Sequence, residues 1–182
     1  MLNINYIKSL VNNEKIAASM LALGLLPFSI SLFWGGPQWL IGTIVNFCLY
    51  LGVILLPKKY IFPMVILPSI GVLARGLIFG PLTLFLLYFL PFIWLANLIM
   101  VLIFKRLYDC RKNIWSIFTA SMAKFLFLTI IAFIYIQFNL VPAAFLQLMG
   151  TMQLLTALAG GLITWYLLIV YEKIHTRNRN ID

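Results

Sequence analysis

The chain has 182 residues, of which 64% are apolar and 9% are charged, and its mean hydropathy is +1.06. These values lie far outside the composition of soluble globular proteins and predict an integral membrane protein. The formal net charge of +9 would suggest a nucleic-acid partner in a soluble chain. Here the basic residues gather at the ends of apolar stretches, so nucleic acid is not among the expected partners.

Six apolar stretches are each long enough to cross a bilayer, because a helix spans about 30 Å of hydrocarbon with roughly 20 residues. Stretches this long, without alternation of polar and apolar residues, exclude a membrane β-barrel. The sequence therefore predicts an all-α, six-helix transmembrane bundle that forms a single membrane domain over residues 1–182. The expected spans lie near residues 15–34, 38–56, 60–79, 82–104, 114–138 and 146–171.

The first two spans carry small and polar residues at helical spacing. Ala18 and Ala22 lie one turn apart in the first span, a spacing that permits close approach of another helix. This stretch is span-length and lacks a convincing cleavage site, so it is not expected to be a removed signal. In the second span, Gln38 and Asn46 are unfavourable in lipid, so each is expected to bond to a neighbouring helix or a ligand.

The third span combines two prolines with a charge. Pro63 and Pro68 each remove a backbone donor, so this span is expected to be a broken or tilted helix that faces a cavity, or a simply kinked one. Arg75 lies in the outer half of the span, where it either snorkels outward or faces a cavity. The fourth span adds the amide Asn97, which is interpreted like the amides of the second span.

The fifth span contains a lysine within its apolar stretch, and the sixth contains an amide followed by a run of small residues. Lys124 lies about ten residues into its span, and the sequence offers no acid at that depth to pair with it. A cavity-facing position is therefore predicted for Lys124. In the sixth span, Gln153 precedes the segment 157–161, whose alanines and glycines allow two backbones to approach closely.

The basic residues predict the orientation of the chain. All of the thirteen except Arg75 and Lys124 fall at the two ends or at alternate junctions between spans. Lys and Arg near span ends are retained in the cytoplasm, so both termini are expected inside and three short loops outside. The outer loops are expected near residues 35–38, 80–82 and 139–145.

The sequence shows no equipment for catalysis. The single histidine, His175, and the four acids, Glu14, Asp109, Glu172 and Asp182, are all expected at the cytoplasmic edge. A catalytic pair needs partners that converge in a shielded pocket, so no enzyme activity is predicted. The two cysteines, Cys48 and Cys110, are too few and too far apart for a disulfide framework or a metal cluster, so no cofactor and no metal are expected.

The buried polar and cationic residues instead predict a binding pocket. An anionic or carbonyl-rich small molecule would satisfy Arg75 and Lys124 together. For each amide alone, hydrogen bonding between helices is the simpler interpretation. As a group, with tryptophan and tyrosine nearby, they indicate a small-molecule site. The candidate substrate-binding residues are Trp34, Gln38, Asn46, Arg75, Asn97, Lys124 and Gln153.

The chain resembles the substrate-binding S component of energy-coupling factor (ECF) transporters. The resemblance rests on six spans in a short chain, the Ala18 to Ala22 face, and the run 153–161 followed by Glu172 and Lys173. The segments 42–46 and 67–71 are similar to an uncharacterised subgroup of small membrane proteins.

The resemblance implies capture of a vitamin or similar micronutrient in an outward-facing pocket in the plasma membrane of a prokaryote. It further implies docking to a transmembrane coupling subunit that is driven by two cytoplasmic ATPases. By the same resemblance, Ala18 and Ala22 form the docking face, and residues 34–38 belong to a cap over the pocket. The alternative is a non-catalytic membrane scaffold of the MreD-like cell-shape type, which has a similar six-span plan but needs no buried cations.

Overall fold

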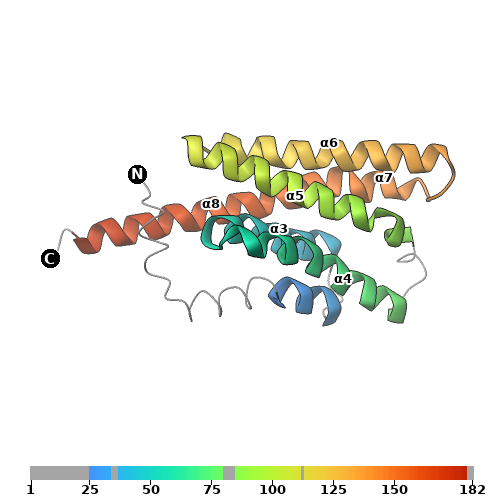
Figure 1. Cartoon of the computed structure of the whole chain (residues 1–182), viewed down its shortest axis with the longest axis horizontal. Helices are drawn as coiled ribbons and strands as arrows, with labels where there is room; N and C mark the ends of the chain where they lie inside the picture. Colours follow the sequence, from blue (N-terminus) through green and yellow to red (C-terminus); the bar gives the residue numbers. More distant parts are fainter. Residues whose placement is uncertain (1–24, 34–36, 80–84, 112, 180–182) are drawn as a thin grey trace.

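The computed structural model describes residues 25–33, 37–79, 85–111 and 113–179, which are helical and contain no strand (Figure 1). This confirms the all-α fold class. After a short helix over residues 25–33, the elements are α3 (Gln38–Leu55), the single turn η1 (Lys58–Tyr60), α4 (Ile61–Phe79), α5 (Leu86–Arg111), α6 (Trp115–Gln137), α7 (Ala144–Met149) and α8 (Thr151–Arg179).

Four helical segments of the described chain are long and apolar enough to cross a membrane. They are Gln38–Leu55, Leu86–Cys110, Trp115–Gln137 and Ala144–Tyr171, and they correspond to the second, fourth, fifth and sixth expected spans. The third expected span is helix α4. Of the first expected span, the structure describes residues 25–33 alone. The total of six spans and the cytoplasmic position of both termini stay predictions.

Helix α6 shows how the bundle suits a hydrocarbon environment. Most of its buried residues are small or polar, including Ser121 and Lys124, whereas its exposed face carries Leu126, Ile130 and Phe133. This pattern is the reverse of a soluble helix, which turns its apolar stripe inward. An apolar outer face is favourable in lipid, so the arrangement agrees with a membrane-spanning helix.

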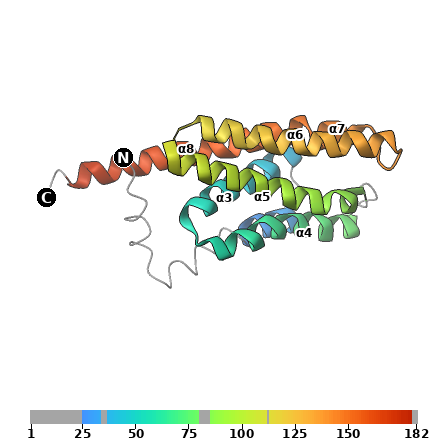
Figure 2. The same ribbon diagram turned by 45° about the horizontal axis from the view of Figure 1, so that its top comes forward.

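The helices pack in two main pairs. Helix α5 pairs with α6, and α3 pairs with α8, while contacts between α6 and α8 join the two pairs. Helix α4 packs against α3 and α5 on the other side of the bundle. Figures 1 and 2 show the C-terminal part of α8 extending beyond the other helices.

An aromatic core fills one half of the bundle. Tyr50, Phe104, Tyr108 and Ile117 are fully buried there, and the rings of Tyr50 and Phe104 meet edge to face with centroids 4.7 Å apart. These residues lie where α3 and α5 approach their C-terminal ends and α6 begins. In the opposite half, a second apolar cluster that includes Phe89, Leu128 and Phe145 packs beside a cavity between the helices.

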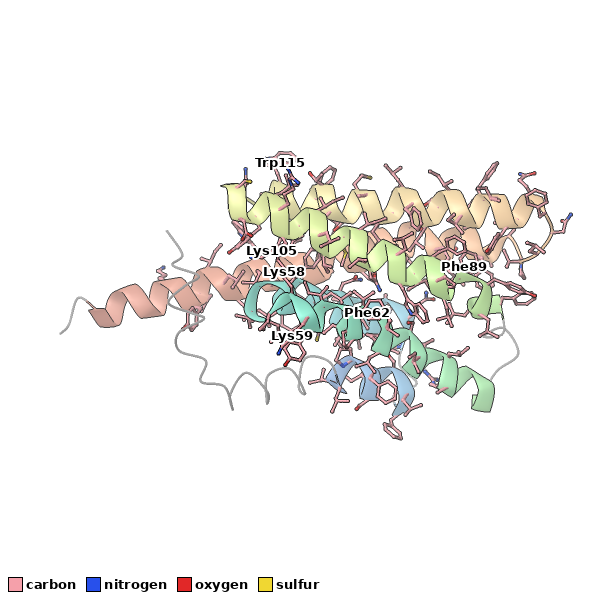
Figure 3. All side chains as sticks on the ribbon, viewed as in Figure 1. Lys58, Lys59, Phe62, Phe89, Lys105 and Trp115 are labelled. Carbon is pink, nitrogen blue, oxygen red and sulfur yellow. The ribbon has the colours of Figure 1, made fainter. Side chains whose placement is uncertain are left out.

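Basic residues gather at the end of the bundle that holds the aromatic core. Lys58 and Lys59 follow α3, and Lys105 lies near the end of α5, where it forms an ion pair with Asp109 at 2.7 Å. Figure 3 shows these three lysines and Trp115 in one half of the molecule, with Phe89 in the other half. These three lysines, which are far apart in the sequence, therefore lie at the same end of the bundle.

The last expected span is interrupted, and the third is not. Helix α7 ends at Met149, and α8 begins at Thr151 after Gly150, whose backbone angles (φ −97°, ψ −103°) are not helical. A Cβ at Gly150 would press on the carbonyl oxygen of Leu146, so glycine is required there. Helix α4, by contrast, is continuous through Pro68, and Pro63 lies in its first turn, where no intrahelical bond is lost. Of the alternatives left open for the third span, a break is not observed, and Pro68 and Arg75 of this helix line a cavity.

The chain returns from α6 to α7 through a tight turn at Asn139. Asn139 has a positive φ of 55°, a region that asparagine tolerates better than most residues. The N–H of Leu140 donates to Tyr135 O at 3.0 Å, and the N–H of Asn139 donates to Ile136 O at 2.9 Å. This is the bond pattern of a Schellman motif, and it places Pro142 and Ala144 at the end of the bundle opposite the lysines.

Candidate functional site

A cavity of about 460 Å³ lies between the helices, in the half of the bundle opposite the aromatic core. Its size is within the usual range for small-molecule pockets and equals the liquid volume of roughly 15 water molecules. The walls are largely apolar and include Ile41, Val45, Ile93, Phe145 and Met149. The polar lining residues are Ser31, Gln38, Asn46, Ser69, Arg75, Asn97, Lys124 and Gln153.

The cavity belongs to the end of the bundle opposite the lysines. Gln38 and Leu86, the first residues of α3 and α5, line its outer part together with Pro142. Asn46 and Asn97 lie further along the same two helices, by about 12 Å and about 16 Å at 1.5 Å per residue. The cavity therefore extends from one end of the bundle to the middle of its helices.

Lys124 is the charged group at mid-depth. Its side chain is 2% exposed, and its Nζ donates a hydrogen bond to Asn46 Oδ1 at 2.7 Å. Among the described residues that line the cavity there is no aspartate or glutamate. A buried ammonium with a neutral partner is strongly disfavoured unless further acceptors or water reach it. Because Lys124 lies in the cavity wall, water or a ligand in the cavity can supply those acceptors.

Asn46 connects three helices and has a fixed amide orientation. Its Nδ2 donates to Gly42 O at 2.8 Å and to Thr156 Oγ1 at 3.2 Å. A backbone carbonyl only accepts and an ammonium only donates, so the oxygen of the amide must face Lys124 and the nitrogen must face Gly42. The network thus ties α6 to α3 and α8 at the cavity wall.

Glycines bring α3 and α8 close enough for this network. A Cβ at Gly160 of α8 would lie 2.6 Å from Phe47 N and 2.8 Å from Thr43 O, so the two backbones are in contact. A Cβ at Gly42 would press on the side chain of Thr156 from 3.0 Å. The close approach that the segment 157–161 predicts is therefore observed, and its partner is α3.

Two buried polar atoms of the cavity wall have no hydrogen-bond partner in the described part of the protein. They are Oδ1 of Asn97, a residue 4% exposed, and Oγ of Ser31, a residue 1% exposed. An unsatisfied buried polar atom destabilises a protein by about 1–3 kcal/mol. Such groups in a cavity wall are typical of sites that bond to an occupant.

The structure brings six of the seven candidate residues to this one cavity. Their use in substrate binding stays a prediction. The six are Gln38, Asn46, Arg75, Asn97, Lys124 and Gln153. Trp34, like the docking residues Ala18 and Ala22, lies outside the described residues.

The aromatic residues near the amides do not line the cavity. Trp39 and Tyr88 are exposed on the outer surface of their helices. Trp94 packs against the core, and its Nε1 donates a hydrogen bond to Ser69 Oγ. The convergence of aromatic side chains on the pocket, which the sequence suggested, is therefore not observed for these three.

Sequence reasoning missed Ser31, Ser69 and Thr156. A lone serine in an apolar helix carries no signal, because membrane helices use serine widely for packing. Thr156 could have been found from spacing, since it lies three residues after Gln153 and four before Gly160, on one face of α8. That face is the one that α3 contacts.

Comparisons with family models, with curated proteins and with solved structures found no match to this chain.

Proposed function

We propose that the protein is the substrate-capture (S) component of an ECF-type importer in a prokaryotic plasma membrane. The observation that carries the proposal is a largely apolar cavity, with Lys124 and a few other polar side chains in its wall, at the end of the bundle opposite the lysines. Because the lysine-rich end is expected in the cytoplasm, the cavity end is expected to face outward. A vitamin or similar small micronutrient would enter there from outside the cell.

The lining suits capture of a small molecule. Apolar walls favour the body of the molecule, and the few polar groups fix its orientation, which is the usual division of labour in a binding pocket. Asn46 and Lys124 are held by bonds among three helices, so this part of the site is ordered before a ligand enters. An MreD-like scaffold has no need for such a pocket.

Transport requires a partner that supplies energy. In this proposal, the chain docks through the Ala18 and Ala22 face of the first span to a coupling subunit that is driven by two ATPases. Small residues at this spacing let a partner helix approach closely. Met20 is about 200° away from both alanines on a helix, so it faces elsewhere.

Purification from native membranes tests the proposal. The tagged chain is expected to purify with one transmembrane subunit and two ATPase subunits, and Ala22→Trp is expected to abolish this association. Met20→Trp is the matched control and should retain the partners. A chain that purifies without an ATPase, or equal retention of the partners by both variants, would argue against the proposed assembly.

A further inference from the structure

The cavity wall offers unused hydrogen-bonding capacity of both kinds. The ammonium of Lys124 has three N–H donors, and one of them is used by Asn46 Oδ1. Asn97 Oδ1 is an acceptor without a partner among the described residues. The Ser31 hydroxyl, also without a described partner, can donate or accept. With the Asn97 amide oriented as in this structure, an occupant that accepts from Lys124 and donates to Asn97 Oδ1 would satisfy both groups.

The donor and the acceptor come from different helices. Lys124 belongs to α6, Asn97 to α5 and Ser31 to the helix over residues 25–33. Lys124 is held by a bond to α3, which leaves its remaining donors for the cavity. An occupant that meets both groups consequently makes two separated polar contacts.

Most of the wall between these groups is apolar. Val45, Ile93, Phe145 and Met149 line the cavity beside Lys124 and Asn97. A simple inorganic anion would contact Lys124 but would leave this apolar surface and Asn97 unused. An occupant with an apolar body gains from burial against these walls, at about 25 cal/mol per Å².

We infer, resting on the capture function proposed above, that the captured molecule is a small organic anion with an apolar body and an N–H or O–H donor. Its anionic oxygen accepts from Lys124, and its donor bonds to Asn97 Oδ1. A charge-assisted bond to Lys124 supplies affinity. Asn97 supplies selectivity, because an analogue without the donor leaves a buried amide oxygen unpaired.

Three matched probes test this inference on the purified protein in detergent. Indole-3-acetate carries a carboxylate, an apolar ring system and an N–H. Indole-3-acetamide lacks the charge, and 1-methylindole-3-acetate lacks the donor. We expect the Kd of indole-3-acetate to be about tenfold lower than the Kd of either analogue, the change produced by one lost buried hydrogen bond.

Two variants assign the preferences to residues. Lys124→Met should reduce the preference for the acid over the amide, because Arg75 is then the one cation left among the described lining residues. Asn97→Leu should remove the preference for N–H over N–CH₃. Trp39→Leu, an exposed position outside the cavity, is the control and should change neither ratio.

Equal binding of the three probes, or preferences that neither variant changes, would overturn the inference. If none of the probes binds while the chain still purifies with its ATPases, the ligand class is wrong and the capture function stands. If the probes bind as expected but no ATPase is found, the ligand class stands and the importer proposal fails.

Discussion

Asn46 is the side chain on which the polar part of the cavity depends. It donates to α3 and α8 and accepts from Lys124 of α6, so both ends of its amide are used. Asn97 has the same chemistry in the same cavity, yet its Oδ1 bonds to no described residue. One amide therefore serves the structure, and the other is available to an occupant.

This difference predicts opposite effects of one substitution at the two positions. Asn46→Leu should destabilise the protein by about 1.5–3 kcal/mol, the contribution of a hydrogen bond to a charged group, because it leaves Lys124 without its partner. Asn97→Leu should leave the stability unchanged or raise it. The thermal unfolding midpoint in detergent measures both effects, and a larger loss for Asn97→Leu would contradict the assignment.

Helices α3 and α8 meet with their backbones in contact at Gly160. The sequence predicts only part of the two helix faces that form this contact. In α3, Gln38, Gly42, Asn46 and Tyr50 recur every four residues, so the sequence locates this polar and small face. The break at Gly150 could not be predicted in the same way. Glycine is frequent inside membrane helices, and only the carbonyl of Leu146 makes it obligatory here.

The contact predicts a contrast between two glycines. Gly160→Ala should destabilise the protein by about 1–3 kcal/mol, because the new methyl group meets the rigid backbone of Phe47 and Thr43. Gly52→Ala meets only the flexible end of Met64, and alanine favours the helix by up to about 1 kcal/mol, so little loss is expected. The thermal unfolding midpoints of the two variants in detergent measure this difference in stability. Equal losses would mean that the α3–α8 contact is looser than described.

One half of the molecule holds the aromatic core, and the other half holds the cavity beside a second apolar cluster. Along α3, the core residues follow Leu49, and the cavity residues precede it. The same order recurs along α8, whereas in α5 the buried Phe89 and Ala96 of the second cluster lie among the cavity residues. Composition and charge predicted the helical class and the lysine-rich end, because both depend on residue type alone. The cavity was predictable only from Arg75, Lys124 and the amides. The apolar residues that line it cannot be told from other apolar residues of membrane helices by sequence.

The proposed function requires an outward-facing cavity with a cation in its wall. The most direct test is the labelling rate of Asn97→Cys in intact cells, in a Cys48→Ala, Cys110→Ser background. The reagents are two membrane-impermeant methanethiosulfonates, one anionic and one cationic. The labelling rate of each is divided by its rate with a free thiol in solution. Leu95→Cys, on the exposed surface of the same helix, is the control and should not react.

We expect Asn97→Cys to react in intact cells. The anionic reagent should react about tenfold faster than the cationic one, which corresponds to about 1.4 kcal/mol of electrostatic preference. Lys124→Met should reduce that preference, and Arg75 in the same wall should maintain the remainder. Labelling only after the membrane is permeabilised, or a rate ratio that does not change with Lys124→Met, would contradict the account.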